Sequence, residues 1–158
     1  MSRENPRDIA SVIHTKAGIH AFAVLAGGGA DGTLKVGEVI DRAAMPHGKS
    51  PALSAEICIA VLAVLASTET CIISTIKVEH DTDSGFSTPT DLKTFTETLT
   101  VTDAVAGEKG ELRLAIDLSS AKQFIRIELT PTMSAGATDT ADIFCSLAFG
   151  GFPVVAVA

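Results

Sequence analysis

Strict alternation of aliphatic and polar residues is the feature that most constrains the fold of this chain. In residues 111–118, ELRLAIDL, every even position is aliphatic and three of the four odd positions are charged. Side chains of a β-strand point alternately to the two faces of its sheet, so this segment is predicted to be a strand with one buried face. That face would carry Leu112, Leu114, Ile116 and Leu118.

Similar patterns predict the other strands. Residues 93–102 place Phe95, Leu99 and Val101 on one side and a row of threonines on the other. β-Branched threonine fits the pleat of a solvated sheet face. Residues 57–66 are apolar on both faces, and their β-branched members favour a strand over a helix. Further strands are expected at 14–26, 34–40, 72–80 and 143–149, and at 124–129, where Ile125, Ile127 and Leu129 alternate with Phe124, Arg126 and Glu128.

Seven or eight short strands separated by turn signals, without long helical segments between them, predict an all-β fold. We expect a single β-sandwich, with a jelly roll preferred over an immunoglobulin-like arrangement. Residues 14–150 would form the sandwich. Residues 1–13 would form an extended N-terminal arm, and residues 151–158 an apolar C-terminal tail.

Composition excludes several classes of protein. The 158 residues suit one domain, and the net charge of −7 argues against nucleic acid as a partner. The longest uninterrupted apolar run, Ile57 to Ala66, has ten residues, whereas a membrane-spanning helix needs about 20. The absence of Trp and Tyr argues against a stacking pocket. Three unpaired cysteines without metal spacing, and no clean secretory leader, predict folding in a reducing cytoplasm.

Motifs that could support chemistry are weak. Asp81 and Asp83 open a stretch similar to a calcium loop, but its glycine falls at position five instead of six and Leu92 stands where the bidentate Glu belongs. We therefore favour an acidic hairpin turn. The histidines have no metal or relay spacing, and their roles stay open: His14, His20, His47 and His80. We therefore predict no catalytic residue, no cofactor and no metal, with Asp81 and Asp83 as the weak metal candidates.

Both ends of the chain are candidate contacts with a partner. The basic residues Arg3, Arg7 and Lys16 suit an acidic partner surface. The apolar tail is poorly suited to solvent, so it is expected to add a strand or to dock on a neighbour. Its candidate contact residues are Phe152, Val154 and Val155.

Four segments resemble the capsid cement, or decoration, proteins of tailed bacteriophages. They are GEVIDR at 37–42, VEHDTDSGF at 78–86, IDLSSAKQFIRI at 116–127 and ATDTADI at 137–143. Phe124 stands where those proteins usually have Tyr, and the apolar tail is not general among them.

The resemblance implies a non-enzymatic virion protein, made in the host cytoplasm, that binds the outer capsid surface. It would stabilise contacts between major capsid proteins and associate with itself as a dimer or trimer. Lys122 and Arg126 could pair with acidic capsid loops, or could be ordinary solvated charges. Two alternatives stay open. One is another virion component, such as a tail-tube or head-completion protein, and the other is a soluble calcium- or carbohydrate-binding β-sandwich centred on residues 81–85.

Overall fold

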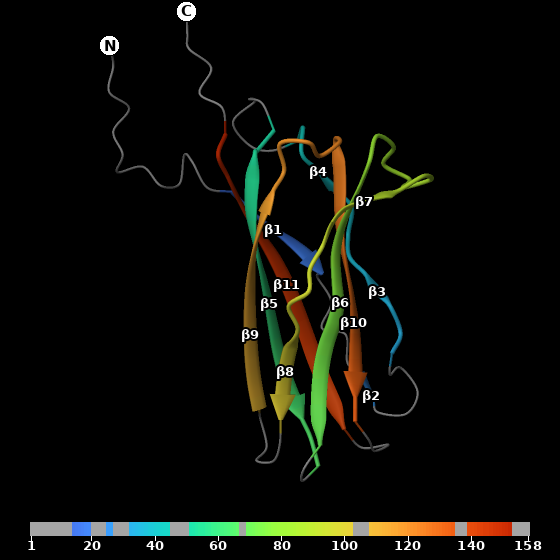
Figure 1. The fold of residues 1–158 in the computed structure, drawn as a ribbon, viewed down its shortest axis with the longest axis vertical. Helices are drawn as coiled ribbons and strands as arrows, with labels where there is room; N and C mark the ends of the chain where they lie inside the picture. The colour runs from blue at the N-terminus through green and yellow to red at the C-terminus, as the bar shows by residue number, and fades with distance from the viewer. Residues whose placement is uncertain are drawn as a thin grey trace, which may run out of the picture.

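Two antiparallel β-sheets stack face to face to form a sandwich (Figure 1). The computed structural model describes residues 14–19, 25–26, 32–44, 51–66, 69–102, 108–134 and 139–152. The first sheet contains β1 (His14–Ile19), β2 (Leu25–Ala26), β5 (Ser54–Val64), β9 (Glu108–Asp117) and β11 (Thr140–Gly150). The second contains β3 (Lys35–Val36), β4 (Ile40–Asp41), β6 (Thr70–Asp81), β7 (Thr90–Thr94), β8 (Leu99–Thr102) and β10 (Phe124–Met133).

The strand order is that of a jelly roll. β1 and β2 both pair with β11, β3 and β4 both pair with β10, and β7 and β8 both pair with β6. Each of these couples is one interrupted strand, so the described segments occupy eight strand positions. The first sheet then runs in the order 1-8-3-6 and the second in the order 2-7-4-5, which is the double Greek key of a jelly roll. The prediction of an all-β sandwich with jelly-roll topology is confirmed.

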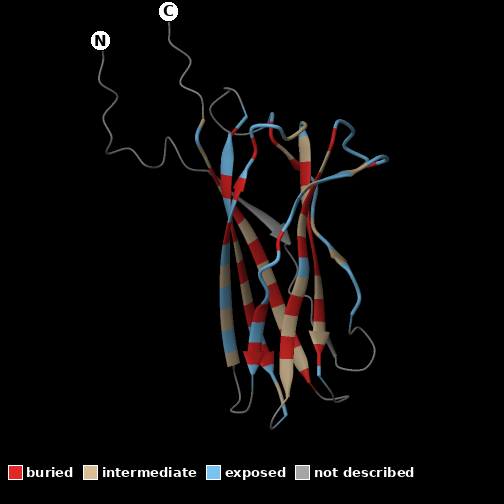
Figure 2. Cartoon of the chain, viewed as in Figure 1, coloured by how far each residue is buried: buried red, intermediate tan, exposed pale blue. Residues whose placement is uncertain are grey.

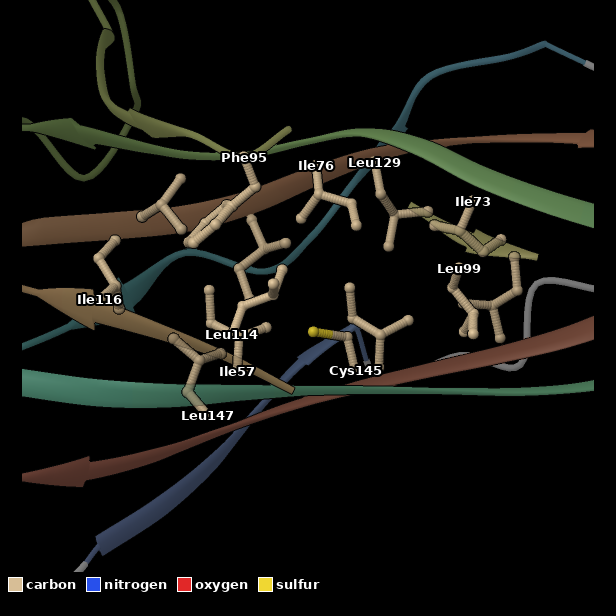
Figure 3. Close-up of a cluster of buried hydrophobic side chains, with 14 of the residues drawn as sticks. Ile57, Ile73, Ile76, Phe95, Leu99, Leu114, Ile116, Leu129, Cys145 and Leu147 are labelled. Atoms are coloured by element: carbon tan, nitrogen blue, oxygen red, sulfur yellow. The ribbon is translucent and has the colours of Figure 1, made fainter. Parts of the chain in front are cut away.

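Figure 2 shows that buried positions occur along the strands of both sheets. Aliphatic side chains from both sheets fill the space between them (Figure 3). Ile57, Leu114 and Leu147 project from the first sheet, and Ile76 and Leu129 from the second. The predicted buried positions on β8, β10 and β11 lie in this core. Leu112 is only half-buried, whereas Leu114 and Ile116 on the same edge strand are buried. Among the cysteines, Cys71 and Cys145 are core residues, whereas Cys58 lies on the outward face beside Glu111.

Three predicted strands are shorter or broken. Residues 34–40 form β3 and β4 on either side of Gly37, whose NH donates to Ile127 O at 2.7 Å. Residues 93–102 separate into β7 and β8, which pair with β6 in different registers. The break at residues 95–98 lies opposite Thr75 of β6, whose backbone φ is 51°. The expected strand 14–26 contains β1 and β2, and residues 20–24 between them lie outside the described part. Alternation predicts the face of each residue but not these local shifts of register.

The chain enters and leaves the first sheet at neighbouring points, because His14 pairs with Phe149. We call this end of the sandwich, which also contains Ser54, Asp81 and Phe124, the entry end. It is the upper end in Figure 1.

Within the described residues no helix is long and apolar enough to cross a bilayer.

Candidate functional site

Four charged side chains form a closed square on the outward face of the second sheet. Arg126 lies opposite Glu79, and Glu128 lies opposite Lys77, on the paired strands β10 and β6. Arg126 Nη2 is 2.7 Å from Glu79 Oε2 and 3.0 Å from Glu128 Oε1. Lys77 Nζ is 2.8 Å from Glu79 Oε1 and 3.0 Å from Glu128 Oε2. Each cation therefore binds both anions, and we call this group the charge quartet.

The charge quartet is largely removed from solvent. The side chains of Glu79 and Glu128 are only 8% and 3% exposed. Phe86 lies over Arg126, with its ring centroid 4.5 Å from the guanidinium carbon. The sequence suggested that Arg126 could meet a capsid loop or face solvent, but both it and Glu128 are committed to internal ion pairs.

Contacts within the charge quartet favour the ionised forms of Glu79 and Lys77. Burial of Glu79 opposes its charge, but hydrogen bonds from Lys77 and Arg126 outweigh that effect and lower its pKa. Hydrogen bonds to Glu79 and Glu128 raise the pKa of Lys77. The exposed Asp91 also lies 3.4 Å from Lys77 Nζ, so both cations of the quartet are fully paired. The quartet therefore ties β6 to β10 and leaves neither cation free to attract an anion.

Asp81 and Asp83 build the turn that follows β6. Asp81 accepts hydrogen bonds from the backbone NH groups of Thr82, Asp83 and Thr88 at 2.6, 3.2 and 2.9 Å. These bonds lower its pKa even though burial opposes its charge. Asp83 accepts from the NH of Gly85 at 3.0 Å. Both carboxylates thus act as turn-forming groups. Within the described residues, no group of three or more His, Cys, Asp or Glu side chains could hold a metal ion.

Arg42 is a buried cation that binds backbone carbonyls. Its guanidinium donates to Ala52 O at 2.7 Å, Leu118 O at 2.9 Å and Lys122 O at 3.0 Å, and also to Ala121 O. These carbonyls belong to the two segments that precede β5 and β10. Burial lowers the pKa of Arg42. One side chain therefore satisfies carbonyls that the sheets leave unpaired at the entry end.

His80 is a second member of this junction. Its Nδ1 accepts a hydrogen bond from the backbone NH of Lys122 at 3.2 Å, which requires an unprotonated Nδ1. Burial, followed by the positive charges of Lys122 and Arg42, lowers the pKa of His80. His14 lies in β1, and His20 and His47 lie outside the described residues.

Three of the segments that carry the resemblance to cement proteins meet at the entry end. Arg42, from residues 37–42, binds carbonyls within residues 116–127. Residues 78–86 contribute His80, bound to Lys122, and Glu79 and Phe86, both in contact with Arg126. The fourth segment begins the last strand, where buried Asp139 accepts from the NH of Ala66 at 2.9 Å. The described residues of the first three segments named here are therefore framework residues of the entry end, whereas Asp139 of the fourth lies at the opposite end.

A shallow hollow lies on the outward face of the first sheet near the entry end. Residues 54–56 of β5, 115–116 of β9 and 148–150 of β11 line about 380 Å³ of mostly apolar space. It exists because Glu56 lies between two small neighbours, Ala115 and Ala148. The hollow suits an apolar side chain of a partner.

The structure describes only two of the six residues that were predicted to contact a partner. Lys16 lies in β1, paired with Leu147. Phe152 is half-buried and packs on the hydrophobic core of the sandwich. Arg3, Arg7, Val154 and Val155 lie outside the described residues. The role of all six as contacts stays a prediction.

The charge quartet and Arg42 were missed as structural groups. A signal for the quartet was present, because opposite charges two residues apart, at 77–79 and 126–128, occur in two predicted strands. No comparable signal marks Arg42. Its partners are backbone carbonyls from distant segments, which any sequence could supply.

No protein-family model and no curated protein matches this chain. Among solved structures, a chain of infectious bursal disease virus, Gx strain, is similar with a TM-score of 0.48 and 14% identity. The match covers 86% of this chain, which spans 32% of the viral chain. The TNF Eiger of S. frugiperda matches with a TM-score of 0.40 and 9% identity, over 93% of this chain and 98% of that one.

A third similar structure contains the CBM22-1 and GH10 modules of Clostridium thermocellum xylanase 10B. Its TM-score is 0.36 at 15% identity, over 90% of this chain and 30% of that one. With TM-scores below 0.5 and identities below 25%, these three likenesses define neither a family nor a function.

Proposed function

We propose that this protein is a non-enzymatic virion structural protein that binds the outer surface of a capsid and stabilises contacts between major capsid proteins. The observation that carries this proposal is the pairing of His14 with Phe149, which brings the attachment points of both predicted contact segments to the entry end. Residues 1–13 and 153–158 are therefore tethered to one pole of a rigid sandwich.

The entry end has the properties that such an attachment needs. Arg42, His80 and the charge quartet fix the strands and turns there by hydrogen bonds and ion pairs. The apolar hollow beside Gly150 adds a surface at the entry end that suits an apolar side chain of the capsid partner. Two tethered segments and a rigid surface give several weak contacts, and capsid symmetry multiplies them into stable attachment.

Truncations test this proposal on capsids stripped of the protein. Deletion of residues 1–8, or of residues 153–158, is expected to lower occupancy on the capsid while thermal unfolding stays unchanged. A longer deletion of 152–158 serves as a comparison, because Phe152 packs on the core and its loss should also lower stability. Wild-type occupancy with both shorter deletions would show that the ends do not attach the protein.

Copy number in purified particles separates the cement role from the other virion roles. A protein that covers a capsid is present in copies on the order of hundreds, because it follows the capsid lattice. A neck or head-completion protein follows the symmetry of one vertex, so six or twelve copies per particle would overturn the cement assignment.

A further inference from the structure

The two sheets have four edges, and three of them are interrupted. β1 shifts register between Ala17 and Ile19, β3 and β4 have two residues each, and β7 and β8 are separated by residues 95–98. β9 differs, because it pairs with β5 in one unbroken register from Glu108 to Asp117. Proteins usually interrupt exposed edges to prevent pairing with other strands. A long, regular edge is therefore a template for another strand.

The free backbone groups of β9 can be assigned to particular residues. Leu118 donates its NH to Leu53 O at 2.8 Å, in line with the register that pairs Asp117 with Ser54. Hydrogen-bonded pairs alternate along an antiparallel ladder, so the even residues of β9 bond to β5. The odd residues 109–117 direct their NH and carbonyl groups to the open edge. Figure 2 shows this strand largely exposed or half-buried.

The outward side chains on the same odd positions alternate in charge. They are Lys109, Glu111, Arg113, Ala115 and Asp117, and all five residues are exposed. If β9 pairs antiparallel with itself about a dyad at Leu112, each Glu111 lies opposite Arg113 of the second copy. A dyad at Arg113 places two arginines together, and a dyad at Glu111 places two glutamates together. The registers about Gly110 and Ala115 also place opposite charges face to face twice, but they pair only residues 108–112 or 113–117 of the strand. The register about Leu112 pairs residues 108–116 and contains no direct like-charge pair, so it combines charge complementarity with the longest ladder.

Leu112 itself supports this register. It is half-buried and contacts the core of its own sandwich only in part. At the dyad it meets Leu112 of the second copy in a non-hydrogen-bonded pair, where side chains approach most closely. Arg113 already binds Glu56 at 3.3 Å and Glu111 within one copy, so the paired strands share a continuous row of charges.

We propose that this protein forms a dimer in solution by antiparallel pairing of β9 with β9 of a second copy, with Glu111 opposite Arg113 of that copy. The two first sheets then form one continuous sheet across the dyad. This inference rests on the β9 edge and is independent of capsid attachment, which would use the entry end.

Charge reversal and charge exchange test the dimer by sedimentation equilibrium of the full chain. Arg113→Glu places glutamates opposite each other twice, and it is expected to weaken dimerisation roughly 10- to 30-fold. The double variant Glu111→Arg, Arg113→Glu restores both opposite-charge pairs and should dimerise within about threefold of the wild type. Lys93→Glu is the matched control, because it makes the same charge change at an exposed position on the edge strand of the other sheet.

Hydrogen exchange gives a second readout that locates the interface. Amides of Glu111, Arg113 and Ala115 should become protected as concentration rises, whereas those of Leu112 and Leu114 are already protected by β5. A wild-type protein that stays monomeric at all concentrations would refute the dimer. So would a dimer unaffected by Arg113→Glu, a double variant as weak as the single one, or concentration-dependent protection confined to another strand.

Discussion

Phe86 covers the guanidinium of Arg126 with its ring, at 4.5 Å from ring centroid to guanidinium carbon, although it follows β6 by five residues. Phe86 has a backbone φ of 50°, a region that bulky side chains rarely adopt. The chain accepts this strained conformation where it places an aromatic ring over a buried ion pair. Phe86 therefore links the acidic turn to the charge quartet.

Replacement of Phe86 should expose the charge quartet to water. We expect Phe86→Leu to lower the free energy of unfolding by about 1 kcal/mol more than Phe95→Leu does, because it also removes a close cation–π contact. Phe95 is equally buried, but its cation, Lys93 Nζ, lies 5.8 Å from the ring. Urea denaturation of both variants measures the difference, and equal losses would contradict a special role for Phe86.

Loss of one charge from the quartet should cost more than loss of one exposed charge. Glu128→Gln removes a buried carboxylate that pairs with both Lys77 and Arg126. We expect the free energy of unfolding to fall by about 2 kcal/mol, because both cations lose a charged partner away from solvent. Glu111→Gln removes the exposed partner of Arg113, where solvent screens the ion pair, and should cost clearly less. Chemical denaturation at pH 7 compares them at a concentration where both are monomeric, and a reversed order would exclude a stabilising quartet.

Protonation of His80 should destabilise the fold. Its pKa is lowered in the folded protein, so the unfolded chain binds a proton first as the pH falls below the ordinary value of 6.5. The contribution of neutral His80 to the free energy of unfolding is therefore complete above pH 6.5. It is lost as the pH falls through the lowered pKa that His80 has in the folded protein. We expect urea midpoints of the wild type to drop between pH 7.5 and 5.5. His80→Gln should flatten that slope, and an unchanged slope would assign the effect to another group.

A second pH window belongs to Glu79. Its lowered pKa means that its stabilising contribution is present above the ordinary value of 4.5 and is lost as the pH falls further. Glu79→Gln should lower stability at pH 7 and reduce the decline below pH 4.5. Far-UV circular dichroism of the wild type and of Glu79→Gln during an acid titration measures this decline. An identical acid transition in the two proteins would show that Glu79 does not cause the loss of stability below pH 4.5.

Arg42 should not be replaceable by another cation. Lysine has three donors on one atom and cannot reproduce a planar fork that reaches four carbonyls. We expect Arg42→Lys to lower the free energy of unfolding by about 3 kcal/mol, since it leaves buried carbonyls unpaired. Lys35→Arg, on β3, is a control for the exchange of cation type. If Arg42→Lys retained wild-type stability, charge alone would explain the role of Arg42.

Gly110 permits the close approach of β8 and β9. A Cβ at this position would lie 2.7 Å from Val101 Cγ2 and 3.1 Å from Leu99 Cδ1, so Gly110→Ala is expected to destabilise by about 1–3 kcal/mol. Gly150→Ala is the matched control, because its added Cβ would lie 3.9 Å from Ser54 Oγ, an ordinary van der Waals distance. Thermal unfolding of the two variants should separate them clearly, and similar melting temperatures would contradict tight packing at Gly110.

Alternation predicted the fold class and most of the core, because the period of two assigns each side chain to a face. It assigned Glu128 to the outward face correctly but could not show that the face is covered there. Phe86, which covers part of it, lies about 40 residues away in the chain and in a turn without periodicity. Arg42 was beyond prediction for a similar reason, since its partners come together only after both sheets have formed.

The position of His14 beside Phe149 also gives the molecule a polarity that could be used in design. Glu108, where β9 begins, and Thr140, where β11 begins, lie at the opposite end. That end is roughly 35 Å away, the length of an eleven-residue strand. On a capsid bound through the entry end, a peptide inserted between Thr102 and Glu108 would project from the particle, whereas one fused to either terminus would be trapped against the shell.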